Sequence, residues 1–153
     1  MNTDLSAILP QLLPKAIQWA QLKSHEILTS GKMLSEADIE LSRRVGVTYP
    51  EKIRICTVTN LPLPDDAELR NYALQVGLLG SGFIGLTLGY GIYICKGYHS
   101  HRLISHECRH VYQYEAAGSI EAFLPDYLQQ IAVFGYHNAP YEKDAIDHEI
   151  ESS

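Results

Sequence analysis

The chain has 153 residues, of which 46% are hydrophobic and 20% are charged, so its composition is that of one folded domain and not of a disordered chain. A net charge of −6 and the lack of any Lys/Arg run argue against nucleic acid as a partner, because phosphate binding needs clustered cations. The three cysteines have no paired spacing, which argues against a disulfide framework and predicts a reducing, cytoplasmic location.

The first half of the chain is predicted to contain two helices, one strand and a third helix. Its opening segment is acidic and interrupted by prolines, so we expect mature protein there and not a secretion signal. A helix is expected over 15–30, with Trp19 packing it onto a sheet, and a second helix over 35–46 with a serine at its N-cap. Clustered β-branched residues predict a strand over 52–59, and apolar residues at helical spacing predict a third helix over 65–76.

The uncharged stretch VGLLGSGFIGLTLGYGIYIC, residues 76–95, is compatible with two structures. Its length is that of a membrane-spanning helix. Against this, glycine is dense, and each glycine weakens an isolated helix by about 1 kcal/mol. Apolar residues alternate from Ile84 to Leu88, and they alternate again after a turn at Gly89–Gly91. We therefore expect two strands that form a hairpin, and no membrane span.

The C-terminal part is predicted to be helical. One helix is expected over 101–117, capped by Ser100 and ended by a glycine. Another is expected over 119–134, bent or restarted at Pro125 because proline cannot donate a hydrogen bond inside a helix. A short last helix begins near Pro140. The order of helices, strands and helices indicates an α+β domain.

The predicted helix over 101–117 carries the pattern His-Glu-x-x-His at His106, Glu107 and His110. Residues four apart lie one turn above the other on one helix face, so both imidazoles can bind one cation, and Zn²⁺ prefers such nitrogen ligands. Glu107 is rotated away from that line but stays within reach of a metal-bound water, where a general base is needed. Because so short a pattern also occurs by chance, a metal site here requires two further features. One is a strand before the helix, which is predicted, and the other is a third ligand downstream.

Three downstream side chains compete as the third ligand. The long metalloprotease pattern with glycine at 113 and histidine at 116 is excluded, because the chain has Gln113 and Ala116. Glu142 is preferred, since a helix and a turn separate it from the motif and can return its carboxylate to the histidines. His137 and His148 stay as alternatives.

The segments SHECRHVYQYE, GY and APYEKDA resemble the gluzincin group of zinc metallopeptidases, in particular small bacterial domains of unassigned function. The resemblance extends over about residues 84–147, and the matching residues are His106, Glu107, His110, Gln113, Tyr114, Glu142 and Ala145. It implies a zincin-like α+β fold, in which a small mixed or antiparallel sheet precedes the His-Glu helix and further helices follow. It also implies that residues 89–95 bind an extended peptide as an added strand. The implied site is Zn²⁺ held by His106, His110 and Glu142, with Glu107 as general base.

The sequence departs from the gluzincin pattern in two places. Many gluzincins have an aspartate four residues after the glutamate ligand, and this chain has Ile146 there, while Asp144 and Asp147 point elsewhere on an ideal helix. The sequence also stops soon after Glu142, without the larger C-terminal lobe that forms one wall of the cleft. We therefore expect a small substrate, a latent site or a site that another protein completes.

Other polar residues near the motif have expected roles of their own. Attack on a carbonyl requires a donor for the oxyanion, and Tyr136 is the candidate, with Tyr141 second. Cys108 lies on another helix face than the histidines and is expected to be a buried structural thiol. Arg102 and Arg109 are expected to be solvated.

These features predict a single-domain zinc-dependent metallohydrolase, a peptidase in which a zinc-bound water activated by Glu107 attacks the carbonyl of a peptide or protein substrate. One alternative is a catalytically silent zincin-like module that holds zinc for binding or regulation. Another is an integral-membrane peptidase that spans at 76–95. The expected domain covers residues 1–153, divided into N-terminal helices (1–50), strands and one helix (51–95) and metal-binding helices (100–153).

Overall fold

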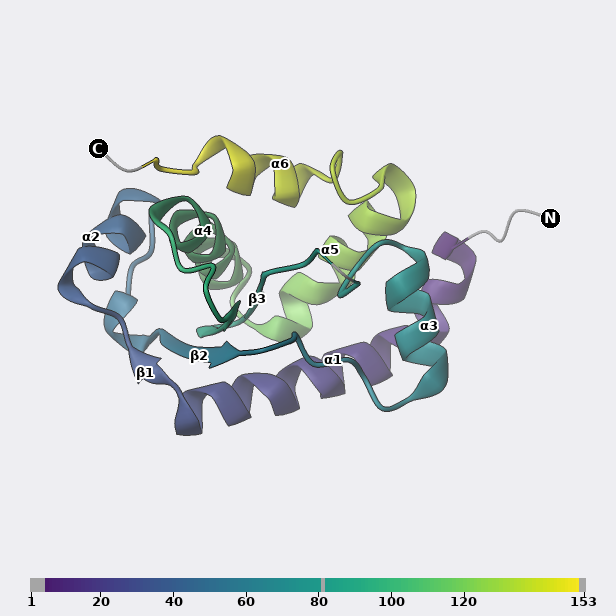
Figure 1. The fold of residues 1–153 in the computed structure, drawn as a ribbon. Coiled ribbons are helices and arrows are strands. Elements are labelled where there is room, and N and C mark those ends of the chain that lie inside the picture. The colour runs from purple at the N-terminus through teal and green to yellow at the C-terminus, as the bar shows by residue number, and fades with distance from the viewer. Residues whose placement is uncertain (1–4, 81, 152–153) are drawn as a thin grey trace.

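The computed structural model describes residues 5–80 and 82–151. These residues form a mixed α+β fold in which helices surround one four-stranded sheet (Figure 1). The elements are α1 (Leu5–Ser30), β1 (Lys32–Met33), α2 (Glu36–Arg44), the 3₁₀ helix η1 (Pro50–Lys52), β2 (Arg54–Val58), α3 (Ala67–Gln75), β3 (Gly85–Leu88), β4 (Gly91–Cys95), α4 (His101–Ala117), α5 (Ile120–Phe134) and α6 (Pro140–Asp147).

The sheet is mixed, with the strand order β1-β2-β4-β3. β3 and β4 form the predicted antiparallel hairpin, in which Thr87 pairs with Ile92. β4 also pairs with β2 in parallel. The expectation that a peptide adds to residues 89–95 is therefore wrong, because β4 already has a neighbour on each side. β1 and β3 are the two edge strands. The long-range pairing of β2 with β4 could not be read from local sequence.

Helices cover both faces of the sheet. Ile92 and Ile94 of β4 pack against α4, which is backed by α2, whereas Tyr93 and Cys95 pack on the side covered by α1. α6 crosses α4 on the side away from the sheet (Figure 1). The fold thus places one face of α4 in the core and another face beneath α6.

The first helix is longer than the predicted 15–30, because it begins at Leu5 and includes two prolines. Each proline costs roughly 3 kcal/mol in a helix interior. The buried side chains of Leu9 and Leu12 offset part of this cost, since a fully buried leucine contributes roughly 1.5–3 kcal/mol. The other buried residues of the same helix face, among them Ala20 and Ile27, add to this stabilisation, so the local proline rule did not decide where the helix begins.

Most other predicted limits are confirmed. Ser35, Asp66, Ser100 and Ser119 each accept a hydrogen bond from a backbone N–H three residues ahead, as N-caps do. α4 has the predicted limits, and Gly118 ends it with a φ of 101°. α5 is one helix across Pro125, not two. The two-residue strand β1 was not predicted.

The uncharged stretch 76–95 does not form a helix. Apart from Ser81, which lies outside the described residues, it forms the turn that follows α3, a loop and the β3–β4 hairpin. In residues 5–80 and 82–151, no helix combines the length and the apolar composition needed to cross a membrane. The predicted hairpin is therefore confirmed, and the alternative of one helix over 76–95 is wrong.

Candidate metal centre

The three predicted ligand side chains meet between α4 and α6. The ligand atoms that His106, His110 and Glu142 offer all lie within 4.8 Å of one another. The residues are 9%, 6% and 1% exposed, respectively. The histidines are one turn apart on α4, and Glu142 lies in the first turn of α6, which crosses above them. These three residues can therefore hold a metal ion in a buried position.

The distances within this group suit a tetrahedral ion. Oε1 of Glu142 is 3.2 Å from Nε2 of His106, and Oε2 is 3.0 Å from Nε2 of His110. Two ligands bound to Zn²⁺ at tetrahedral angles are roughly 3.3 Å apart, given metal–ligand bonds of about 2.0–2.1 Å. Two imidazoles and a carboxylate form a donor set used in catalytic zinc sites. The residues therefore fit a divalent transition metal.

The two alternative histidine ligands lie elsewhere. His148 is at the C-terminal end of α6, where its Nδ1 contacts the backbone oxygen of Asp144 at 2.7 Å. His137 lies on the wall of an open cleft, outside the cluster of ligand atoms. Glu142 is therefore the third side chain that the fold brings to the two histidines.

A chain of hydrogen bonds fixes the ring of His110. Its Nδ1 donates to Oε1 of Gln113 at 2.8 Å, which leaves Nε2 facing Glu142. Gln113 in turn donates to Oδ2 of Asp144 at 2.8 Å and to the backbone oxygen of Tyr141 at 2.9 Å. Asp144 also accepts two hydrogen bonds from Arg109. His110 is thus oriented by groups that are themselves held in place.

A different carboxylate orients His106. Its Nδ1 contacts Oε2 of Glu149 at 2.8 Å, so Nε2 again faces Glu142. Glu149 lies after α6, and the next residue, Ile150, is tied to α4 by a hydrogen bond of 2.7 Å from its backbone N–H to Oγ of Ser105. Both imidazoles therefore point the same nitrogen into the centre.

The buried histidines and Glu142 shift one another's pKa values. Burial alone would lower the pKa of His106, but hydrogen bonds and charge from Glu142 and neighbouring carboxylates raise it to about 9. Burial would raise the pKa of Glu142, but the charge of His110 and hydrogen bonds from both histidines and Tyr127 hold it well below its ordinary value. Glu142 therefore favours a proton on each Nε2 atom, and a bound cation would replace these two protons.

Tyr127 of α5 is a member of the centre that the sequence did not indicate. Its hydroxyl donates to Oε2 of Glu142 at 2.6 Å, and its ring packs edge-on against His110 at 6.1 Å between centroids. Burial and the charge of Glu142 raise the pKa of this phenol well above its ordinary value, so it stays a donor. Phe123 and Tyr127 are four apart on α5, which was the only local sign that Tyr127 faces inward.

Glu107, the predicted general base, is beside the ligand group but outside it. Its side chain is 5% exposed, and its Oε1 accepts a hydrogen bond of 2.8 Å from the hydroxyl of Thr87 on β3. A Cβ atom at Gly85 would approach Oε2 of Glu107 to 3.0 Å, so glycine leaves the room that this carboxylate occupies. β3 therefore positions the carboxylate of Glu107.

An open cleft of about 970 Å³ leads to this carboxylate. Residues from the start of β3 line it, together with His106, Tyr136, His137 and Glu149. The ring of Tyr136 packs edge-on against Phe83 at 4.9 Å. Burial, Glu142 and Glu107 raise the pKa of Tyr136, which keeps its hydroxyl protonated beside the carboxylates. Tyr141, the second candidate donor, packs its ring against Phe123, with 4.8 Å between ring centroids, and does not line the cleft.

Two sequence expectations about charged residues near the motif are wrong. Arg109 is not solvated: it is mostly buried between Asp144, the backbone oxygen of Val45 and the ring of Tyr112. Asp144 was expected to point away, yet it joins the hydrogen bonds that lead to His110. Ile146 is 43% exposed, so its position faces away from the histidines. Cys108 is fully buried in the core, as predicted.

Comparisons of the chain with protein-family models, with curated proteins and with solved structures gave no match. The fold and the site therefore define the class of the protein. The protein is a mixed α+β domain with a buried His-His-Glu group that can hold a metal ion.

Proposed function

We propose that the protein is a zinc-dependent hydrolase of zincin-like fold, most simply a peptidase. One observation carries the proposal: His106, His110 and Glu142 form a group that can hold a metal ion, and Glu107 lies beside them. Glu107 is not a member of that ligand group, and it lines the cleft. A purely structural zinc site has four protein ligands and needs no such base. The gluzincin-like motif supports the same assignment.

The residues around the cleft have distinct roles in this proposal. A zinc ion held by the three ligands supplies Lewis-acid chemistry, which polarises a carbonyl and makes water more acidic. Glu107 accepts a proton from the attacking water and passes it to the leaving amine as the carbon–nitrogen bond breaks. Tyr136, which lines the cleft beside Glu107, donates to the developing oxyanion. Among the residues that the structure describes, β3 has no strand partner on its outer side, and its first residue, Gly85, lines the cleft, where its backbone can pair with an extended substrate.

The test begins with metal content and one isosteric substitution. We expect about one zinc per chain, and we expect Glu107→Gln to keep the metal and to reduce hydrolysis of peptide substrates at least about 100-fold. The matched control is Glu121→Gln, the same change at an exposed position on α5. Protein without bound zinc would refute the proposal, and a Glu107→Gln variant as active as the parent would refute the role of Glu107.

The same experiment separates the alternative of a silent metal-binding module. That alternative predicts about one zinc per chain and no cleavage by the parent on peptides that vary widely in sequence. The position of Glu107 opposes it, since burial of an ionisable carboxylate at the mouth of a cleft has an energetic cost that metal binding alone does not require.

A further inference from the structure

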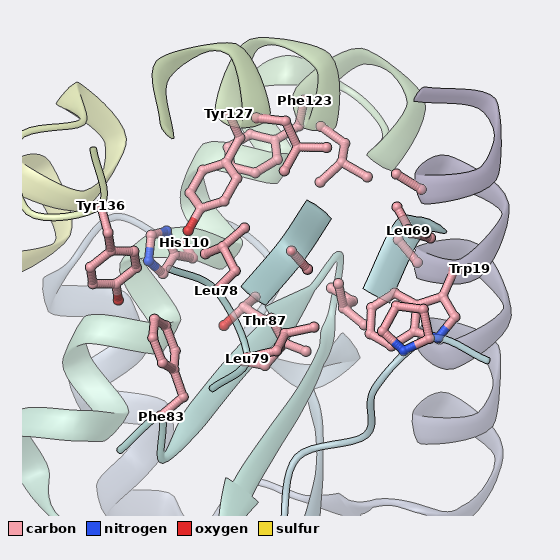
Figure 2. Close-up of a pocket in the computed structure, with 18 of the residues that line it drawn as sticks. Trp19, Leu69, Leu78, Leu79, Phe83, Thr87, His110, Phe123, Tyr127 and Tyr136 are labelled. Carbon is pink, nitrogen blue, oxygen red and sulfur yellow. The ribbon is translucent and has the colours of Figure 1, made fainter. Parts of the chain in front are cut away.

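A narrow cavity of about 100 Å³ adjoins the metal centre inside the protein. One end is lined by Glu107, His110 and Glu142. The other end is lined by side chains of α1 and α3. In Figure 2, His110 and Tyr136 lie at one side of this space, and Leu69 and Trp19 lie at the opposite side. The cavity therefore runs from the candidate reaction centre into the core between the helices.

The walls of this cavity offer little to a polar occupant. Three hydroxyls along it already donate to neighbouring groups of the centre: Thr87 to Glu107, Tyr127 to Glu142, and Tyr114 to the backbone oxygen of Thr87. A fourth, that of Tyr72, donates to the backbone oxygen of Leu5, and the remaining one belongs to Tyr136, which lines the end shared with the cleft. The remaining walls are mainly leucine and alanine side chains. The indole nitrogen of Trp19 is buried without a partner, but one uncharged N–H cannot replace the hydration of a charge. The chemistry of the walls selects an uncharged apolar group.

The cavity and the open cleft meet at the predicted base. Four residues line both spaces: Phe83, Gly85, Glu107 and Tyr136. A substrate in the cleft that presents its carbonyl to Glu107 therefore has one side group next to this cavity. This position beside the reacting atoms distinguishes the cavity from a packing defect elsewhere in the core.

The size of the cavity limits what can enter. A cavity of about 150 Å³ in another protein core stays dry and binds benzene. The smaller volume here matches a branched aliphatic group of about four carbons, such as isobutyl. We propose that the cavity is the specificity pocket for one such group on the substrate, the size of a leucine side chain. This inference rests on the proposed hydrolase function, because that function places the substrate at Glu107.

Trp19 is the chain's single tryptophan and lines this cavity, so its fluorescence reports occupancy without any need for catalysis. The probes are isovalerohydroxamate, which carries an isobutyl group on a zinc-chelating head, and acetohydroxamate, which carries only a methyl group. Zinc-loaded protein should bind the isobutyl compound roughly 50-fold more tightly, because each buried methylene contributes about fourfold. Equal affinities would overturn the inference and leave the metal centre intact.

Two substitutions fill the cavity from different helices. Ala16 of α1 and Ala73 of α3 both line it and are buried, so Ala16→Leu and Ala73→Leu should each reduce the preference for the isobutyl probe at least about tenfold. Affinity for acetohydroxamate should stay within about twofold of the parent. Ala7→Leu, at an exposed position of α1, is the matched control and should retain the full preference. If both filled variants fold and keep the parent preference, the isobutyl group does not enter this cavity.

A metal-free arm separates failure of this inference from failure of the proposed function. Isovaleramide and acetamide carry the same two groups without a chelating head. On metal-free protein, isovaleramide alone should change Trp19 fluorescence at millimolar concentration, and Ala16→Leu should abolish the change. This result together with protein that binds no zinc would refute the hydrolase and keep the apolar pocket. No difference between the two amides would overturn the pocket.

The aliphatic group can belong to a peptide side chain or to a short acyl chain, and cleavage assays distinguish these sources. Peptides with leucine on either side of the scissile bond are compared with alanine peptides and with a simple amide of isovaleric acid. Preference for a leucine peptide assigns the pocket to a side chain, whereas preference for the isovaleryl amide assigns it to an acyl chain. Equal cleavage of the leucine and alanine peptides and of isovaleryl and acetyl amides would contradict the pocket.

Discussion

The surroundings of His106 and His110 differ, although the two residues lie one turn apart and point the same nitrogen at Glu142. His110 is oriented from within the fold, by Gln113 on its own helix, which is 4% exposed. His106 is oriented by Glu149, a residue beyond α6 whose side chain is 21% exposed. One ligand is thus part of the core, and the other depends on the placement of a C-terminal segment.

The largest loss of zinc affinity should come from a change at Glu142, because this residue contacts both histidines. Glu142→Ala removes the carboxylate between the two rings and leaves Tyr127 without its acceptor. We expect the loss in zinc affinity to exceed the roughly 10- to 100-fold that removal of an outer partner costs. Metal content after dialysis measures it, with Glu121→Ala at an exposed position as control. Zinc retained at the parent level would mean that Glu142 is not a ligand.

A smaller but still large loss of zinc affinity is expected when Gln113, the buried partner of His110, is changed. Gln113→Leu leaves Nδ1–H of His110 without an acceptor and breaks the connection to Asp144. Because water does not readily reach this site, zinc affinity should fall toward the upper end of the 10- to 100-fold range. Competition with a fluorescent zinc chelator measures the change. Gln129→Leu, on the exposed face of α5, should bind zinc as the parent does.

Glu149→Ala tests the exposed side and should cost about tenfold in zinc affinity. Water can replace the lost carboxylate at Nδ1 of His106, because Glu149 lies at the cleft. Glu151→Ala makes the same change two residues later, on the same cleft wall, and should have no measurable effect. An effect larger than that of Gln113→Leu in the same chelator competition would reverse the proposed difference between the two histidines.

The smallest effect is expected at Arg102, whose side chain is 65% exposed and whose Nε is 3.4 Å from Oε1 of Glu149. Exposed ion pairs contribute about 0–1 kcal/mol, so Arg102→Ala should change zinc affinity less than about fivefold. The difference should shrink further in 1 M salt. Adding Arg102→Ala to Glu149→Ala should have no extra effect, and an additive loss would mean that Arg102 acts on the centre by another route.

Features that depend on near neighbours in the chain were predictable. The limits of α4 follow from Ser100 and Gly118, and the placement of His106 and His110 on one face follows from their spacing of four. The alternation around β3 and β4 was likewise enough to predict a hairpin. Where local rules failed, as at the prolines of α1, burial along the inner face of the whole helix offset the cost of the prolines.

Features that depend on distant segments were only partly predictable. Glu142 was chosen because a helix and a turn could bring it back, but nothing local indicated Tyr127 or Glu149 as its companions. Asp144 was set aside because, on an ideal helix, it points to another side than position 146, where many gluzincins have aspartate. The angle at which α6 crosses α4 decided instead that Asp144 faces Gln113 and that Ile146 faces outward.

The sequence by itself determined the helix that carries the motif, the shared face of its two histidines and the presence of a carboxylate able to join them. The tertiary structure alone decided which carboxylates orient them, which strand is open at the edge, and that an apolar cavity ends at Glu107. The physical reason is the range of the interactions. Helix caps and helical spacing act over three or four residues, whereas His106 meets Glu142 and Glu149 across 36 and 43 residues of chain. Such contacts exist only once the apolar faces of the helices have packed on the sheet.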